Sequence, residues 1–348
     1  MAFAVRVSFF IVIFVIMQIQ VLISANHQVP CFFVFGDSLV DNGNNNRLVT
    51  EAKVDYLPYG VDFPQGPTGR FTNGRNTADI LAQLLGFNSS VPPFATAQGN
   101  DVIKGVNYAS GSSGIRSETG EQLGDRISLD RQLQNHETTF SSISRLLGND
   151  TSAKIHLSKC VYYFVVGSND YINNYNMPEY YTTSTKYNPQ EYSSILVQQY
   201  SQQLNSLYNN FGARKVVVSG VGPLGCTPAE IAKGTNGTAC ADSVNDAVTL
   251  FNDKLKLMVN GLNQNLTGAE FVYNGAMDLR PKDLIALGIR IVGKPCCKVS
   301  SKTGQCIKGE KPCLVRALHA FFDNFHPTEV VNNAVAAATY IQILKLLH

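Results

Sequence analysis

Short apolar runs alternate with long helical patterns along this 348-residue chain. The runs are nearly continuous in β-branched or aromatic residues, which is typical of strands buried on both faces of a sheet. They are CFFVF (31–35), GVNYAS (105–110), VYYFVV (161–166), KVVVSG (215–220) and EFVYN (270–274). Because long segments join them, the strands are expected to pair in parallel, with helices as crossovers. The sequence predicts one three-layer α/β/α domain, from residue 29 to 348, around a five-stranded parallel sheet.

The expected helices lie between these strands or after the last one. The first, 77–85, has Asn76 as its N-cap and Gly86 as its stop signal. The others are expected near 128–147, 191–212 and 243–266, and from Pro327 to Leu347. In open parallel sheets, ligand sites form at the carboxyl ends of the strands. Side chains just after each strand are therefore the first candidates for chemistry.

The first 25 residues differ from the rest of the chain. Arg6 precedes a long apolar stretch, and Ser24-Ala25 supplies small residues at its end. This pattern predicts a secretory signal peptide over 1–25, cut after Ala25; the alternative is a retained membrane anchor. No other stretch reaches the roughly 18 apolar residues of a spanning helix, and no retention tetrapeptide ends the chain. A secreted, extracellular protein is therefore expected.

Cysteine content and glycosylation sequons agree with that compartment. The chain has eight cysteines, which suggests disulfides. We expect one bridge between Cys226 and Cys240, and one or two among Cys296, Cys297, Cys306 and Cys313. Adjacent Cys296 and Cys297 should not pair with each other. A zinc knuckle at 296–313 is disfavoured, because that segment lacks histidine and paired C-x-x-C arms.

Cys31 and Cys160 stand at the starts of apolar strands and are expected to be buried thiols. Four N-x-S/T sequons beside turn-like residues predict glycosylated surface loops at Asn88, Asn149, Asn236 and Asn265. A formal net charge of +2 with no long basic run makes nucleic acid a poor partner. The oligomeric state is not indicated.

Ser38 is the candidate nucleophile. It follows the first strand directly, and Gly36 would allow a sharp turn that exposes its hydroxyl. A serine hydroxyl needs an adjacent base to act as a nucleophile. Taken alone, Ser38 is better explained as a helix N-cap than as a catalytic residue.

His326 is the candidate base, found by elimination among six histidines. His136 and His156 lie in or beside helical patterns, where a solvated side chain is expected, and His319 lies in an apolar and basic stretch. Asp323 stands three residues before His326, close enough to accept its ring N–H and fix its tautomer.

Asn169 and Gly111 are the candidate oxyanion donors. Asn169 follows the strand at 161–166, and its amide can donate to a developing negative oxygen. Gly111 follows the 105–110 run, and its backbone N–H can approach a substrate closely. Each residue alone could equally belong to a turn.

Taken together, these segments resemble plant GDSL-motif esterases/lipases of the SGNH hydrolase superfamily. The matching motifs are FGDSLVDNGNNN, PTGRFTNGRNTADILAQLLG, GVNYASGSSGI, VVGSNDYINNY, GVGPLGCTP and DNFHPTE. The resemblance implies a flavodoxin-like fold, with Ser38, Asp323 and His326 as the triad. It also implies an oxyanion hole of the Gly111 N–H, the Asn169 amide and the Ser38 N–H. The sequence departs from the pattern of this family at two places beside the site. Ser112-Ser113-Gly114 stands where Gly-Ala-Gly is common in the family, and Phe321-Phe322 stands where Phe-Trp is common.

The expected reaction is hydrolysis of small-molecule or lipid carboxylic esters through an acyl-serine, with neither metal nor cofactor. Acyl transfer to an alcohol on the same triad is one alternative, and a secreted binding protein on an idle hydrolase scaffold is another. The segment 171–192 holds six of the fifteen tyrosines and either borders the acyl cleft or forms a surface loop. Asp41 and Asn44 are expected to buttress the loop after Ser38.

Overall fold

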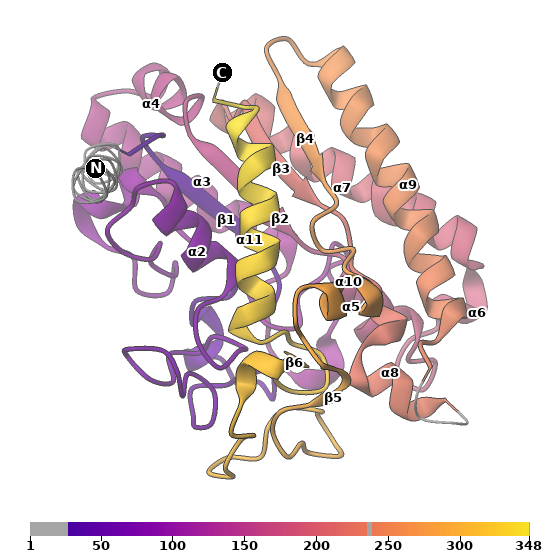
Figure 1. Cartoon of the computed structure of the whole chain (residues 1–348). Helices are drawn as coiled ribbons and strands as arrows, with labels where there is room; N and C mark the ends of the chain where they lie inside the picture. The colour runs from indigo at the N-terminus through magenta and orange to yellow at the C-terminus, as the bar shows by residue number, and fades with distance from the viewer. Residues whose placement is uncertain (1–26, 235–238, 348) are drawn as a thin grey trace, which may run out of the picture.

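The computed structural model describes residues 27–234 and 239–347. Its main sheet has four parallel strands in the order β1-β2-β3-β4. The strands are β1 (Phe32–Gly36), β2 (Val161–Val165), β3 (Lys215–Ser219) and β4 (Glu270–Asn274). A separate parallel pair, β5 (Ile291–Pro295) with β6 (His319–Phe321), lies beyond the carboxyl ends of the main sheet (Figure 1). The fold class is the predicted one.

The predicted strand at 105–110 is not a full strand. It runs beside β1 and makes only an isolated parallel bridge between Asn107 and Val34. The Val34 N–H donates to Val106 O at 3.1 Å, and the Tyr108 N–H donates to Val34 O at 2.8 Å. This segment therefore holds the place of a fifth strand at the edge of the sheet. Its pairing with β1 does not continue regularly, because the next donor along β1, the Gly36 N–H, donates to the Gln132 side chain at 2.9 Å instead.

Two helical layers cover the two faces of the sheet (Figure 1). One face, with Phe33, Phe35 and Phe164, packs against α3, α7 and α9, and the other, with Val34 and Tyr163, packs against α2 and α11. Alternate residues of each strand thus enter opposite cores, which explains why the strand sequences are continuously apolar. The helices are α2 (Thr77–Leu84), α3 (Leu129–Leu147), α4 (Asp150–Leu157), α5 (Ser168–Asp170), α6 (Thr183–Lys186), α7 (Pro189–Phe211), α8 (Pro228–Lys233), α9 (Asp242–Asn265), α10 (Pro281–Ala286) and α11 (Glu329–Leu344).

The start of α2 is fixed by the predicted N-cap. The Asn76 side chain accepts the Asp79 N–H at 3.0 Å, and the Asp79 carboxylate accepts the Asn76 N–H at 3.0 Å. Arg70 then pairs with Asp79 through two bonds of 2.7 and 2.8 Å. This reciprocal capping satisfies donors that would otherwise be left unpaired at the helix end.

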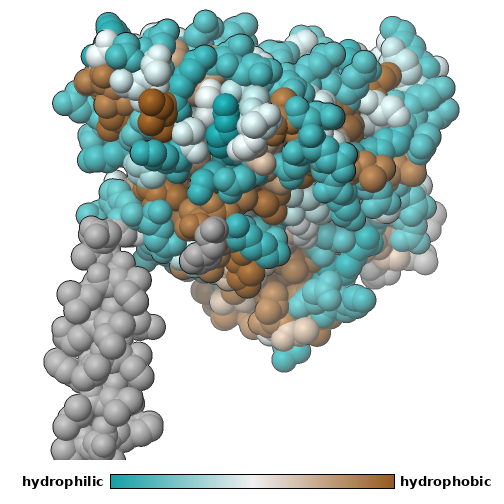
Figure 2. Space-filling model, turned by 90° about the horizontal axis from the view of Figure 1, so that it is seen from above, coloured by the Kyte–Doolittle hydropathy of each residue, from teal (hydrophilic) through white to brown (hydrophobic). Residues whose placement is uncertain are grey.

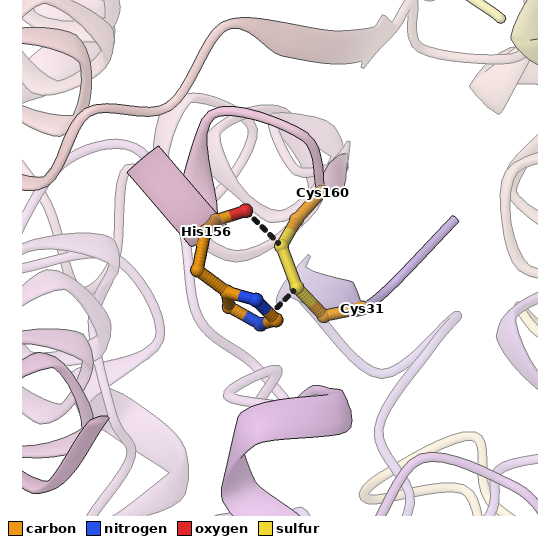
Figure 3. A group of neighbouring side chains, drawn as sticks. All are labelled: Cys31, His156 and Cys160. Carbon is orange, nitrogen blue, oxygen red and sulfur yellow. Dashed lines mark hydrogen bonds between the residues drawn. A yellow bond between two sulfur atoms is a disulfide. The ribbon is translucent and has the colours of Figure 1, made fainter. Parts of the chain in front are cut away.

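Four disulfides tie the described part of the chain. Cys226–Cys240 is the predicted bridge, and Cys296–Cys313 and Cys297–Cys306 confirm bonds within 296–313 that avoid the adjacent pair. The prediction of free thiols at Cys31 and Cys160 was wrong, because parallel pairing of β1 and β2 sets these residues side by side and they form the fourth disulfide. Figure 3 shows this bridge with the His156 ring, whose Nε2 lies 3.2 Å from Cys31 Sγ.

The face in Figure 2, seen from above Figure 1, is mostly hydrophilic, with some brown hydrophobic areas. Three sequon asparagines, Asn88, Asn149 and Asn265, are exposed, and Asn236 lies outside the described residues. The predicted signal peptide, 1–25, also lies outside them. Within residues 27–234 and 239–347, no helix is both long and apolar enough to span a membrane.

Candidate active site

Ser38, His326 and Asp323 meet at the carboxyl ends of the sheet strands. Ser38 Oγ lies 2.8 Å from His326 Nε2. His326 Nδ1 lies 2.8 and 2.9 Å from the two carboxylate oxygens of Asp323. The structure thus brings the predicted nucleophile, base and acid into one hydrogen-bonded chain, across 288 residues of sequence between Ser38 and His326. This is the geometry in which an imidazole can take the serine proton.

Gly36 and Gln132 fix the backbone just before Ser38. A Cβ at Gly36 would lie 2.2 Å from Val165 O, so only glycine allows β1 to end against β2 at this point. The Gln132 side chain accepts the Gly36 N–H at 2.9 Å and donates to Gly36 O at 2.8 Å. Both backbone groups of Gly36 are thereby held by one buried side chain. The sequence pattern did not reveal this role of Gln132.

Asp323 is fully buried, and its carboxylate accepts hydrogen bonds from three donors in addition to the His326 ring. The N–H groups of Phe325 and His326 each donate to Oδ1 at 2.8 Å, and the Tyr59 hydroxyl donates to Oδ2 at 2.6 Å. Burial and the neighbouring carboxylate raise the pKa of Tyr59 well above its ordinary value, so this hydroxyl keeps its proton. Sequence reasoning missed Tyr59, because 264 residues separate it from Asp323.

The disulfide-bonded segment 296–313 braces the loop that carries Asp323 and His326. The N–H groups of Cys296 and Cys297 donate to Phe322 O at 3.0 and 3.1 Å, and the Cys306 N–H donates to the Tyr59 hydroxyl at 3.0 Å. The Phe71 ring also packs beside His326, with the two ring centroids 4.8 Å apart. The bridges predicted from sequence therefore support the catalytic acid and base directly.

Asn169 lies on the short helix α5, which follows β2, and it lines the cavity beside Ser38. Its Nδ2 donates to Ser113 O at 2.9 Å, and its Oδ1 accepts from Asn173 Nδ2 at 2.7 Å. These two bonds fix which end of the amide is the donor, because Oδ1 can only accept. One N–H of Asn169 remains for a substrate oxygen. Asn173, on the π-helical turn Tyr171–Tyr175, is a second residue that the sequence did not indicate.

Gly111 does not offer a free N–H. Its N–H donates to Asp41 Oδ2 at 3.1 Å, and Ser112 rather than Gly111 lines the cavity. Asp41 is a buried organiser of the loop after Ser38, since its Oδ1 also accepts the N–H groups of Gly43 and Asn44 at 2.7 and 2.8 Å. The predicted assignment of Gly111 to the oxyanion hole is therefore replaced by a structural role.

The asparagine-rich stretch 42–46 secures this loop. Asn44 Nδ2 donates to Asn107 O at 2.9 Å and to Ala109 O at 2.7 Å. Asn45 Nδ2 donates to Gly111 O at 3.1 Å. These amides supply the pairing that the irregular 105–111 segment cannot obtain from a ladder. The predicted buttressing by Asp41 and Asn44 is confirmed.

Three buried acids surround the site without belonging to the triad. Burial raises the pKa of Asp37 to about 7 and those of Asp41 and Asp170 to about 6. Asp170 accepts the N–H groups of Ile115 and Arg116 at 2.8 and 3.0 Å, which ties the 111–116 segment to α5. Asp37 Oδ1 accepts the Leu39 N–H at 3.0 Å, whereas its Oδ2 is buried without a partner. With a pKa of about 7, Asp37 is mostly protonated only at pH values below 7.

A cavity of about 480 Å³ opens over Ser38 and His326. One part of its lining carries amides, namely Gln122, Asn169, Asn173 and Asn176. Another part is apolar and comes from the segments around α10, β5 and α11: Leu279, Leu284, Val292, Val331 and Val335. The volume suits a small organic ligand. The site can therefore hold a molecule with both a polar and an apolar portion.

The tyrosine-rich segment 171–192 borders the cavity, but through other residues. Ile172, Asn173 and Met177 line it. Tyr171 and Tyr192 are instead packed in the core, with ring centroids 5.8 Å apart. Of the two expected alternatives, the segment therefore borders the cavity, although these two tyrosines do not line it.

Of the other histidines in the described residues, His136 and His156 make their contacts away from Ser38. His136 was expected to be solvated and is instead fully buried among aromatic rings, where burial lowers its pKa to about 3. It lies on the helix face that meets the sheet, which the sequence pattern of α3 did not mark. His156 is half-buried, with Nε2 3.0 Å from Ile103 O.

Two Cys/His groups have a spacing that could suggest a metal site. They are Cys31-His156-Cys160 and Cys296-Cys313-His319. In each group the two cysteines are bonded to each other, so neither offers the thiolate that a metal requires. These groups are best described as disulfides with a nearby histidine.

Comparisons with known proteins indicate which family this chain belongs to. Residues 32–339 match the family described as GDSL-like Lipase/Acylhydrolase. A GDSL esterase/lipase of Arabidopsis thaliana is 47% identical over 322 residues, covering 91% of this chain and 88% of the relative. A second from the same plant is 45% identical over 318 residues, covering 89% and 88%. An extracellular lipase from Streptomyces rimosus has a solved structure with 14% identity and a TM-score of 0.35, covering 91% of this chain and 99% of that one.

A parallel α/β sheet with a serine, histidine and aspartate chain at its carboxyl end defines a serine hydrolase. The match over residues 32–339, together with these relatives, identifies the chain as a member of the GDSL-like lipase/acylhydrolase family. It is a carboxylic ester hydrolase.

Proposed function

We propose that this enzyme is secreted and cleaves carboxylic esters through an acyl-serine intermediate on Ser38. The observation that carries the mechanism is the continuous chain from Ser38 Oγ through His326 to Asp323, with bonds of 2.8 Å on either side of the imidazole. The mixed polar and apolar cavity supports small-molecule or lipid esters as substrates.

In the first half-reaction, Ser38 Oγ attacks the ester carbonyl carbon while His326 Nε2 takes the hydroxyl proton. The tetrahedral intermediate collapses as His326 returns that proton to the leaving alcohol, and the acyl group stays on Ser38. Water then attacks the acyl carbonyl with His326 again as base, and the acid product leaves. Asp323 holds the imidazole with its Nδ1–H toward the carboxylate.

The oxyanion receives the free N–H of the Asn169 amide and the backbone N–H of Ser38. Asn169 is pre-oriented by Ser113 O and Asn173, so it needs no reorganisation when negative charge develops.

Secretion is proposed from the signal-peptide pattern at 1–25, which lies outside the described residues, followed by a single hydrolase domain over 29–348. Four disulfides support an oxidising compartment. The exposed Asn88, Asn149 and Asn265 are available to carry glycans, and Asn236 is proposed as a fourth site from its sequon alone. Glycosidase treatment of the secreted protein should lower its apparent mass; an unchanged mass would contradict this proposal.

The test of activity is a panel of nitrophenyl esters of rising acyl length, measured with the wild type and with Ser38→Ala. We expect release of nitrophenol by the wild type and essentially none by the variant, which loses one hydroxyl and should fold normally. Hydrolysis by Ser38→Ala at the wild-type rate would refute the mechanism. An inactive wild type that is folded would instead favour a binding protein on this scaffold.

A further inference from the structure

Exposed apolar side chains gather on two segments of the chain, 57–61 and 314–318. Among the described residues, fifteen large apolar side chains are exposed, and five of them come from these two segments: Leu57, Val61, Leu314, Val315 and Leu318. Leu314 is the most exposed of the fifteen, at 94%. Single exposed apolar side chains are common, whereas a group of them marks an interaction surface. We call these five side chains the apolar patch.

The two segments of the apolar patch are joined by hydrogen bonds at one end of the molecule. The Gly309 N–H donates to Leu57 O at 2.9 Å, and Arg316 Nη2 donates to Asp62 Oδ1 at 2.6 Å. Both segments lie beyond the carboxyl ends of the main sheet, in the region of β5 and β6 (Figure 1). Residues 301–305, in the disulfide-bonded loop that leads to Leu314, line the catalytic cavity. The patch and the cavity therefore share one end of the fold.

The chain around the apolar patch is strongly basic. Residues 290–318 include seven lysines and arginines and one acidic residue, although the whole chain has a net charge of only +2. Three of the seven cations are paired: Lys298 with Glu310, Lys302 with Glu51 and Arg316 with Asp62. The other four are exposed and form no ion pair with a described residue: Arg290, Lys294, Lys308 and Lys311. Apolar side chains and cations without an acidic partner thus occur together on this segment.

We propose that the apolar patch and its neighbouring cations dock the enzyme on an anionic lipid surface. Leu314 and Val315 enter the boundary between headgroups and acyl chains, and Lys308 and Lys311 lie at the level of the lipid phosphates. An acidic polysaccharide would attract the lysines but offers no apolar medium for the leucine and valine, so lipid fits both parts of the surface. Docking brings the mouth of the catalytic cavity to the lipid, but it does not itself require catalysis.

The test is co-sedimentation of the enzyme with vesicles of phosphatidylcholine, with and without phosphatidylglycerol. We expect binding to the anionic vesicles that weakens as salt is raised. The double variant Leu314→Ser/Val315→Ser should raise the apparent Kd at least about 10-fold, because two apolar side chains no longer enter the lipid. Lys308→Glu/Lys311→Glu should raise it at least about 10-fold as well, because like charges then face each other. Both should hydrolyse soluble nitrophenyl butyrate at the wild-type rate, since none of these four residues lines the cavity.

Matched controls come from the opposite end of the sheet. Ile155, on α4, is 56% exposed, as Val315 is, and the exposed Lys159 precedes β2. The double variant Ile155→Ser/Lys159→Glu should bind anionic vesicles as the wild type does. Ser38→Ala should do so too, which separates docking from catalysis: an enzyme that binds vesicles but hydrolyses no ester would contradict the proposed function and leave the docking intact.

Three results would overturn the proposed docking. They are a wild type that does not bind anionic vesicles, equal binding to vesicles of phosphatidylcholine alone, and a loss of binding in the control double variant as large as in the patch variants. Sedimentation with polygalacturonate but not with vesicles would also overturn it, and would assign the surface to an acidic polysaccharide.

Discussion

Asp37→Asn should change how stability depends on pH. Burial is the largest cause that raises the Asp37 pKa from 3.8 to about 7, so the folded protein binds a proton there that the unfolded chain has lost. A raised carboxyl pKa contributes stability that is fully present below the unfolded value and is lost as pH rises through the folded value. The window is therefore about pH 4 to 7.

The magnitude follows from the number of protons involved. Between pH 5 and 6.5 the folded state holds nearly one proton on Asp37 and the unfolded state nearly none, given pKa values of about 7 and 3.8. Each pH unit then lowers the free energy of unfolding by roughly 1.3 kcal/mol, which gives about 2 kcal/mol over the interval. Asparagine at this position has no proton to lose, so that contribution should vanish.

The assay is urea unfolding of the wild type and Asp37→Asn at pH 5 and 6.5. The fall in the free energy of unfolding from pH 5 to 6.5 should be about 2 kcal/mol larger for the wild type. Asp62→Asn is the control, because its bond to Arg316 lowers the Asp62 pKa and moves its titration below pH 4. That variant should keep the wild-type pH dependence. If Asp37→Asn also kept it, the assignment of a neutral buried acid beside Ser38 would be refuted.

Three further substitutions test the supports around the triad. Asn169→Ala should lower kcat by roughly 10²–10³, as for loss of one pre-oriented oxyanion donor, and a loss below threefold would reduce Asn169 to a turn residue. Asp323→Asn should lower kcat on the order of 10⁴ while the protein stays folded by circular dichroism; an activity near wild type would remove Asp323 from the triad. Tyr59→Phe should lower the free energy of unfolding in urea by about 1–3 kcal/mol, because the Cys306 N–H loses its partner and Asp323 Oδ2 keeps only His326. No loss would show that water replaces the hydroxyl.

The fold class was predictable because strand burial leaves a strong mark on sequence. Phe32 to Phe35 enter both cores, so the apolar run shows no alternation and indicates a central parallel strand. The segment 105–110 also lies beside β1, yet the Gly36 N–H that would continue its ladder donates to Gln132 instead. Composition cannot show this, because Gln132 is 96 residues from Gly36 in sequence.

Site residues were predictable when a short motif contained the reactive group. Ser38 and Asn169 each follow a strand, and His326 follows Asp323 by three residues, so local sequence made them candidates. Only their combination distinguished them from N-cap and turn residues. Tyr59 and Asn173 are defined only by the partners that the fold brings to them. Gly111 shows the same limit, since nothing local indicates that its N–H is used by Asp41.

Cys31 and Cys160 illustrate a longer-range limit. Each begins a strand, and each reads locally as a small apolar residue. Parallel register between β1 and β2 then brings them together, although they are 129 residues apart in sequence. The bridges within 296–313 were easier to anticipate, because their partners are only 9 and 17 residues apart.

The central claim is that Ser38 is the nucleophile and that His326 activates it. The most direct measurement is reaction with a serine-directed organophosphonate, followed by mass mapping of the labelled peptide. The account predicts one adduct, on Ser38, in the wild type, none in Ser38→Ala, and labelling slowed by at least about 10³ in His326→Ala, because the base and nucleophile act as a unit. An adduct on another cavity serine such as Ser168, or labelling of His326→Ala at the wild-type rate, would contradict it.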